Sequence, residues 1–85
     1  MSPAPKPPDQ DSYSGRFAAR LKSLREKAGL SVPQITEALR SNKYTLGDRT
    51  YYQWESGRSM PPIDAFPALA MALNLKSPRL LLPQS

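Results

Sequence analysis

The stretch Asp48-Arg-Thr-Tyr-Tyr-Gln-Trp-Glu55 decides how the rest of the chain is interpreted. An α-helix turns once about every 3.6 residues, so a helix over these residues divides its side chains between two faces. One face carries the bulk that a core needs, on Tyr51, Trp54 and Glu55. Gly57 can take the left-handed conformation that ends a helix, and Pro61 cannot continue one. We therefore expect a helix of about two turns that is anchored on one side and ends sharply.

The opposite face of this helix carries hydrogen-bonding groups, one aromatic ring and one positive charge, on Arg49, Thr50, Tyr52 and Gln53. Reading base edges in the major groove of DNA requires such a row of donors and acceptors. Arg49 suits a bidentate contact to guanine O6 and N7, and Gln53 suits adenine N6 and N7. Thr50 and Tyr52 can touch a thymine methyl group or a phosphate. The face therefore indicates base-reading contacts with double-stranded DNA.

Asp48, at the start of the helix, has two interpretations. As an N-cap, its side chain would accept from the free backbone N–H groups of the first turn. As a base reader, it would accept from cytosine N4. Capping is the favoured interpretation, and base reading stays open.

Phosphate contacts would hold such a helix in place, because they position a protein on DNA without reading its sequence. Directly after the helix we expect these contacts from Arg58, Ser59 and the backbone N–H groups near Gly57. Ser31 and Gln34 mark the start of an earlier helix, whose positive N-terminal end attracts a phosphate.

The composition narrows the class of protein. Eighty-five residues make one small domain, and the chain has neither cysteine nor histidine. Disulfides and thiolate metal sites are therefore excluded, and the commonest general base is missing. Because no catalytic pair of residues stands out, we expect no enzyme, no metal site, no cofactor and no small-molecule ligand.

The net charge of +5 favours a polyanionic partner. The longest apolar run is too short to span a bilayer, and no signal-peptide pattern opens the chain. We expect no membrane contact and a cytoplasmic, nucleoid-associated location.

The chain divides into a tail and a domain. Residues 1–13 are rich in proline and poor in apolar side chains, which predicts a flexible tail before a domain over residues 14–83. A first helix is predicted at 14–28, with Gly29 as its C-terminal cap. Its core-facing stripe has helical spacing and comprises Phe17, Leu21, Leu24 and Ala28.

A second helix is predicted from Ser31. The Ser31 hydroxyl can cap it, and Gln34 completes a capping box. Pro33 lies in the first turn, where its missing N–H does no harm. Its inward-facing residues are Ile35, Ala38 and Leu39.

Two further helices are predicted after residue 60. Residues 68–73, with Pro67 at the helix start, form a buried helix whose core candidates and cap are Leu69, Met71, Leu73 and Asn74. Residues 77–82 form a last short helix with Ser77 as N-cap and Pro78 as first residue, and Pro83 ends it. With no strand pattern, the sequence predicts an all-α domain of five short helices.

Three groups of residues together resemble one known family: Trp54-Glu-Ser-Gly-Arg58 with Pro61 or Pro62, then Leu69-Ala-Met-Ala-Leu-Asn74, and upstream the segment Arg20 to Ser31. Over roughly residues 16–82 the chain is similar to the XRE-like helix-turn-helix domain of phage repressor and Cro proteins. The resemblance implies a compact repressor-like fold whose helix at 48–55 enters the major groove. It also implies an ion pair between Arg25 and Glu55.

The chain departs from the family's pattern between the second and third helices. The family joins them by a turn of about three or four residues, and about five extra residues, Arg40 to Tyr44, stand here. We expect an enlarged connection over residues 40–47, in which either the second helix is a turn longer or the loop 41–47 bulges outward. Arg40 and Lys43 either contact DNA phosphates, which is slightly favoured, or are solvated.

Two single positions also differ from the family. Val32 stands where the family has a polar phosphate contact, which weakens one expected clamp. Thr36 stands where the family usually has alanine, close beneath the third helix, so its extra bulk alters the crossing there.

The resemblance implies a transcriptional regulator of the phage or bacterial repressor type that binds double-stranded DNA. Such proteins commonly bind as homodimers on paired half-sites about one helical turn apart. Self-contact would use the apolar end Leu80-Leu81-Leu82. The alternative is a protein-interaction module, an antitoxin or adaptor on the same fold, contacting its partner through the insertion and the Pro-rich tail. A DNA affinity that falls steeply as the salt concentration rises would favour the regulator over the protein-interaction module.

Overall fold

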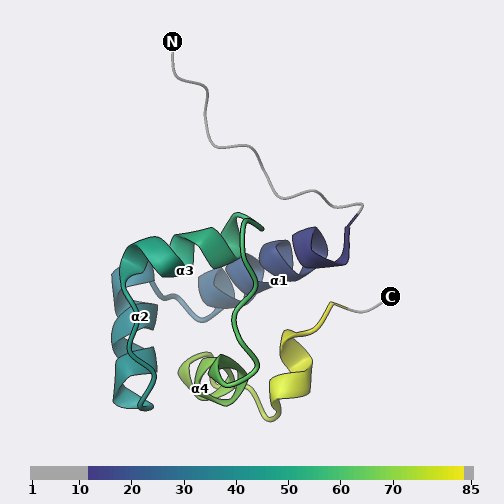
Figure 1. Cartoon of the computed structure of the whole chain (residues 1–85). Helices are drawn as coiled ribbons and strands as arrows, with labels where there is room; N and C mark the ends of the chain where they lie inside the picture. Colours follow the sequence, from purple (N-terminus) through teal and green to yellow (C-terminus); the bar gives the residue numbers. More distant parts are fainter. Residues whose placement is uncertain (1–11, 84–85) are drawn as a thin grey trace.

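Four α-helices and one short 3-10 helix follow one another in the computed structural model, which describes residues 12–83. They are α1 (Tyr13–Lys27), α2 (Val32–Ser41), α3 (Asp48–Glu55), α4 (Ala65–Ala72) and η1 (Pro78–Leu81). No strand occurs within the described range, so the all-α prediction is confirmed. In Figure 1, α2 runs down one side of the view and α3 across the top, with α4 and η1 below. The last predicted helix is a single four-residue 3-10 turn.

Local capping explains where the first two helices begin. Ser12 caps α1, its hydroxyl accepting from the Gly15 N–H at 3.0 Å. Of the tail predicted over residues 1–13, residues 1–11 lie outside the described range, whereas Ser12 and Tyr13 cap and begin α1. Ser31 caps α2 through the predicted capping box: its hydroxyl accepts from the Gln34 N–H, and Gln34 Oε1 accepts from the Ser31 N–H. Two of the first turn's free donors are thereby satisfied.

The core draws on every helix. Its largest fully buried side chains are Tyr51, Phe17, Leu21, Ile35, Leu39, Leu69 and Leu81. Leu24 is only partly buried, and Ala28, the last residue of the predicted stripe, is exposed because α1 ends one residue before it. Gly29 then takes the left-handed conformation, with φ of 73°, and turns the chain toward α2.

The connection between α2 and α3 comprises residues 42–47 and begins with a Schellman motif. Lys43 takes the left-handed conformation, with φ of 68°. Its N–H donates to the Arg40 carbonyl, and the Tyr44 N–H donates to the Leu39 carbonyl at 2.9 Å. Tyr44 then packs against Trp54, with ring centroids 6.1 Å apart. The connection therefore folds onto the core at Tyr44, and Leu46 is partly buried there as well.

The helix α4 begins three residues earlier than predicted. It starts at Ala65, and Pro67 occupies its third position, where a missing N–H is harmless. Leu69 and Leu73 are buried, but Met71 is 68% exposed, so its prediction as a core residue is wrong. Residues two apart on a helix point in nearly opposite directions. Because Leu69 and Leu73 face the core, Met71 between them faces solvent.

The last turn closes the fold. Ser77 caps η1 and Pro78 is its first residue, as predicted. Leu81 is fully buried, so it is unavailable for the predicted self-contact through residues 80–82. Leu80 is 40% exposed, and its carbonyl accepts from Arg20 Nε at 2.9 Å, which ties η1 to α1.

Candidate nucleic-acid interface

The helix α3 divides between core and solvent as its sequence predicts. Tyr51, Trp54 and Glu55 are 0%, 3% and 8% exposed. On the other face three of the predicted base-reading side chains are exposed and the fourth is half-buried: Arg49, Thr50, Tyr52 and Gln53. A polar row thus lies in solvent on a helix that is held from behind by two buried aromatic rings.

Asp48 is exposed at the start of this row, but it does not cap the helix. The N-cap is Gly47, and no side chain caps α3. The predicted capping role of Asp48 is therefore wrong. Its carboxylate instead accepts a hydrogen bond from Thr36 Oγ1 on α2, at 2.7 Å from Asp48 Oδ1. Asp48 still lies in the first turn of α3, where a negative charge is favoured by the helix dipole.

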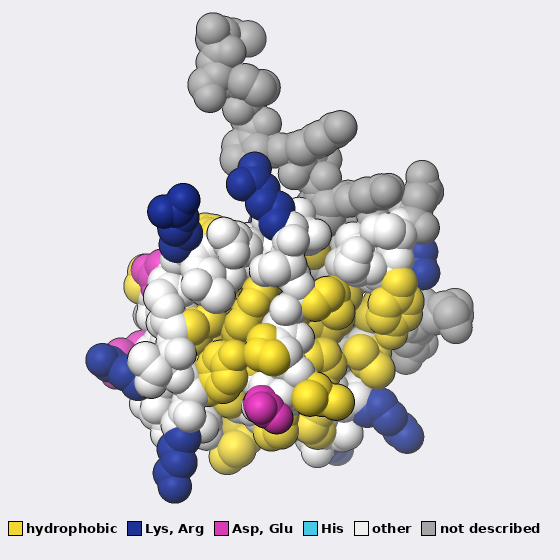
Figure 2. Space-filling model, in the orientation of Figure 1, with side chains coloured by type: hydrophobic (Ala, Val, Ile, Leu, Met, Phe, Trp, Pro, Cys, Tyr) yellow, Lys and Arg dark blue, Asp and Glu magenta, His cyan; other side chains and the backbone are white. Residues whose placement is uncertain are grey.

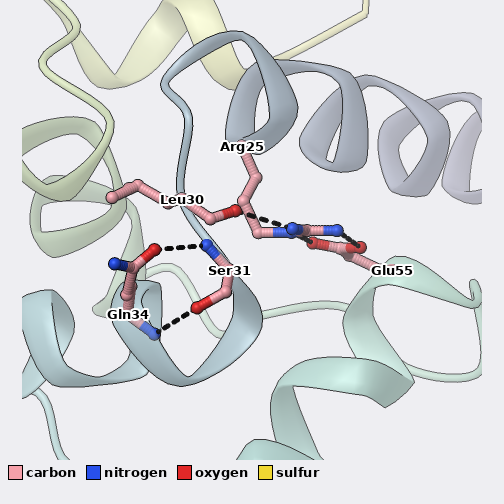
Figure 3. A network of polar contacts seen from close by, with 5 residues as sticks. All are labelled: Arg25, Leu30, Ser31, Gln34 and Glu55. Atoms are coloured by element: carbon pink, nitrogen blue, oxygen red, sulfur yellow. Dashed lines mark hydrogen bonds and ion pairs between the residues drawn. The ribbon is translucent and has the colours of Figure 1, made fainter.

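An ion pair fixes the other end of α3 (Figure 3). Arg25 Nε donates to Glu55 Oε2 at 2.6 Å, and Arg25 Nη2 donates to Glu55 Oε1 at 3.2 Å. The third nitrogen, Arg25 Nη1, donates to the Leu30 carbonyl at 2.8 Å. The hydrogen bond to Glu55 raises the pKa of the Arg25 guanidinium. The pair implied by the resemblance is present, and it joins α1, the turn before α2 and the end of α3.

The backbone N–H groups of the segment after α3 donate hydrogen bonds to carbonyls in the last turns of α3. The Arg58 and Ser59 N–H groups both donate to the Gln53 carbonyl, at 3.1 and 3.3 Å. Gly57 takes the left-handed conformation, with φ of 79°, and its N–H donates to the Trp54 carbonyl. These backbone N–H groups are therefore not free phosphate donors, contrary to the prediction. The exposed side chains of Arg58 and Ser59 remain available.

At the start of α2, the capping box also uses part of the backbone N–H groups that a phosphate would need. The Gln34 N–H donates to Ser31 Oγ, and Pro33 has no N–H, so the Val32 N–H is the first-turn donor left over. The Val32 side chain is 5% exposed and belongs to the core. Ser31 and Gln34 are exposed, and their hydroxyl and amide N–H groups can still donate outward.

Arg40, at the end of α2, and Lys43, in the connection, differ in their surroundings. Arg40 lies in the last turn of α2 and pairs with Glu37 one turn earlier, both side chains being more than half exposed. Lys43 is exposed and has no ion-pair partner among the described residues. A phosphate contact by Arg40 would thus compete with Glu37, whereas Lys43 is unopposed.

A family model for a helix-turn-helix domain matches residues 16–82, most of the chain. The chain belongs to this helix-turn-helix family. The match covers all of the α-helices except the first three residues of α1, and it supports DNA binding by the domain. No curated protein matches the chain significantly.

Other surfaces of the helix-turn-helix domain carry different groups. Figure 2 shows apolar side chains gathered over α4 and η1, with basic side chains around the edge of that face. Residues 12–83 contain no cluster of acidic side chains that could hold a metal ion. Within the same range, no helix is long and apolar enough to cross a membrane.

Two contributors to this site were missed by sequence reasoning. The hydroxyl of Thr36 holds Asp48, and the ring of Tyr44 supports Trp54 from the α2–α3 connection. Neither contact has a local signal in the sequence, since Tyr44 and Trp54 are ten residues apart and Thr36 and Asp48 are 12 residues apart.

Proposed function

We propose that this helix-turn-helix domain binds specific double-stranded DNA sites by inserting α3 into the major groove. The observation that carries the proposal is the division of α3. Arg49, Thr50 and Tyr52 are exposed and Gln53 is half-buried, whereas the aromatic anchors Tyr51 and Trp54 are buried. A helix must be rigidly held from one side if the other is to read base edges in register. The ion pair between Arg25 and Glu55 supplies that support at the end of α3.

The base contacts come from the exposed row. Arg49 contacts guanine and Gln53 contacts adenine, each through two hydrogen bonds. Thr50 and Tyr52 contact a thymine methyl group or a phosphate, and Asp48 accepts from cytosine N4.

Phosphate contacts surround this row. They come from the side chains of Arg58 and Ser59 after α3, from Ser31 and Gln34 at the start of α2, and from the connection. Lys43 in the connection is a stronger contact than Arg40 at the end of α2, because Arg40 is paired with Glu37. The connection of residues 42–47 is, in this proposal, an enlargement of the family's shorter turn that extends the basic surface toward the DNA backbone.

The biological role proposed is transcriptional regulation, as a repressor of the phage or bacterial type, acting at the nucleoid in the cytoplasm. The protein binds as a homodimer on two half-sites about one helical turn apart. Because Leu81 is buried, Leu80 is the exposed member of the apolar end available for self-contact.

Selection of bound duplexes from a random pool tests this proposal, at about 150 mM salt so that non-specific phosphate binding is suppressed. We expect a consensus with two related half-sites. Recovery of duplexes without any consensus would contradict sequence-specific binding.

A second candidate, a protein-interaction module on the same fold, is favoured by the apolar surface. Ile63 and Met71 are 82% and 68% exposed. Neither residue belongs to α3, so DNA contacts by α3 do not account for these exposed apolar side chains. Weak DNA affinity without steep salt dependence, together with a stable protein complex, would favour this role.

A further inference from the structure

Thr36 and Asp48 meet where α2 passes beneath the start of α3. Thr36 is 8% exposed, whereas Asp48 is exposed at the head of the polar row. The distance from Thr36 Oγ1 to Asp48 Oδ1 is 2.7 Å. A nearly buried hydroxyl thus holds an exposed carboxylate from below.

The direction of this hydrogen bond follows from the groups involved. A hydroxyl has one proton to donate, and Thr36 Oγ1 lies within reach of two acceptors: the Pro33 carbonyl at 3.0 Å and the Asp48 carboxylate at 2.7 Å. An ionised carboxylate only accepts, and a bond to it is the shorter and stronger kind. Thr36 therefore donates to Asp48. One carboxylate oxygen is fixed, and Oδ2 has no hydrogen-bond partner among the described residues.

A fixed carboxylate can select one base. In the major groove, cytosine presents only the N4 amino donor, whereas guanine presents the acceptors N7 and O6, and thymine presents the acceptor O4. Adenine offers the N6 donor beside the N7 acceptor. A carboxylate has no proton to give, so acceptors facing it are left unsatisfied, and cytosine is the base whose hydrogen-bonding edge it fully complements.

We propose that Asp48 and Thr36 form a specificity-determining pair, in which Asp48 selects cytosine at one position of the DNA site and Thr36 is the residue that positions its carboxylate. This inference rests on the proposed function, since it requires that α3 lie in the major groove. It goes beyond that function by making the contact of Asp48 with cytosine depend on Thr36, a residue of α2 that does not itself touch a base.

The experiment uses the full chain and the site recovered from the random pool. Affinities are measured for duplexes that carry each of the four base pairs at every position of one half-site. The variants are Asp48→Asn, Thr36→Val, which removes the hydroxyl at nearly constant volume, and Thr36→Ser, which keeps it. Circular dichroism verifies that each variant is folded.

For the parent chain we expect one position where cytosine is preferred by about tenfold. Asp48→Asn should move the preference at that position to adenine, because an amide pairs with N6 and N7. Thr36→Val should reduce the cytosine preference there severalfold and leave the other positions unchanged, and Thr36→Ser should retain it. In an Asp48→Ala background, Thr36→Val should have no further effect on base preference.

Two results would overturn the inference while the proposed function stands. One is a consensus whose base preferences are unchanged by Asp48→Asn. The other is a Thr36→Val variant that weakens all duplexes alike, which would mean that Thr36 only stabilises the packing of α2 on α3. A parent chain that yields no consensus would instead contradict the proposed function itself.

Discussion

Arg25 and Glu55 are joined by two hydrogen bonds although 30 residues separate them in the sequence. Their side chains are only 13% and 7% exposed, and Arg25 also donates to the Leu30 carbonyl. The free energy needed to remove both charges from water offsets much of their Coulomb attraction. The pair therefore contributes more to the orientation of α3 than to net stability. It fixes the end of α3 relative to α1 and therefore the direction in which the polar row points.

We predict that Arg25 and Glu55 act as one unit in stability. Replacing either by alanine leaves the other charge buried without its partner and should cost about 3 kcal/mol in free energy of unfolding. The double variant should lose less than the sum of the two, by at least about 0.5 kcal/mol in a urea-denaturation cycle. The exposed pair of Arg40 and Glu37 is the matched control, with an expected coupling below about 0.5 kcal/mol. Additive losses at Arg25 and Glu55 would contradict the prediction.

The second prediction concerns Tyr51, whose side chain is fully buried and whose hydroxyl has no hydrogen-bond partner among the described residues. Burial raises the pKa of the Tyr51 phenol, and the nearby Glu55 carboxylate raises it further. An unfolded tyrosine has a pKa of about 10, so the folded chain keeps a proton that the unfolded chain releases above that pH. The protonated Tyr51 therefore contributes its full stabilisation below about pH 10. As the pH rises above that value, the free energy of unfolding falls by up to about 1.4 kcal/mol per pH unit.

Tyr51→Phe should remove this loss and leave stability at pH 7 unchanged or raised by up to about 1 kcal/mol, because an unpaired buried hydroxyl disappears. Urea denaturation between pH 7 and 11 measures both effects. Tyr52→Phe, which removes an exposed phenol hydroxyl from the same helix, is the matched control. A marked loss of stability at pH 7 in Tyr51→Phe would show that the hydroxyl is satisfied in solution.

The third prediction concerns Lys43, which occupies the left-handed position of the Schellman motif. This conformation costs a residue with a Cβ about 1–2 kcal/mol, partly offset by the greater chain entropy of an unfolded glycine. Lys43→Gly should therefore raise the free energy of unfolding by about 0.5–1 kcal/mol. Lys43→Ala removes the same charge but keeps the strain, and it should show no gain in thermal or urea unfolding. Equal stability of the two variants would argue against strain at this position.

The fourth prediction tests whether Arg40 and Lys43 contact DNA phosphates or are only exposed to solvent. Replacing both Arg40 and Lys43 by glutamine should flatten the dependence of log affinity on log salt by about one unit per lost contact, with base preference unchanged. Glu37→Gln should strengthen DNA binding, because it frees Arg40 from its partner and removes a negative charge. Titrations of a labelled duplex at several salt concentrations measure both. An unaltered salt slope would mean that Arg40 and Lys43 are only solvated surface.

The features that the sequence predicted well have their partners close by in the chain. Ser31 and Gln34 are three residues apart and form both bonds of the capping box. Ser77 caps the turn that follows it, and Gly57 takes the left-handed conformation two residues after α3. The bounds of α3 were predicted for the same reason, because a short helix with one aromatic face and a glycine after it has few alternatives.

The features that were missed depend on packing. Capping was the favoured interpretation for Asp48 because it stands at the start of α3, where free backbone N–H groups need acceptors, yet its partner is Thr36 on another helix, 12 residues away. Met71 was predicted as buried from its hydropathy, although Leu69 and Leu73 already occupy the core side of α4. Which face of an apolar helix is covered depends on its neighbours, and no local spacing reveals it when nearly every residue is apolar.

The last prediction tests α3 as the reading helix. Arg49 and Gln53 are four residues apart, so their side chains leave the helix on the same face. Replacing either by alanine should change stability by less than about 0.5 kcal/mol, because neither side chain belongs to the core. Affinity for the selected site should fall by about 1–3 kcal/mol per residue, with tolerance appearing at one base pair each.

Two controls separate base reading from general attraction to DNA. Arg58→Ala should weaken all duplexes alike, because a phosphate contact carries no sequence information. Arg79→Ala removes an equal charge from η1, away from α3, and should change affinity least. Fluorescence anisotropy with the selected duplex and single-base variants gives each value. If the Arg49 and Gln53 variants bind the selected duplex as tightly as the parent chain does, α3 is not the reading helix, and the protein-interaction role takes precedence.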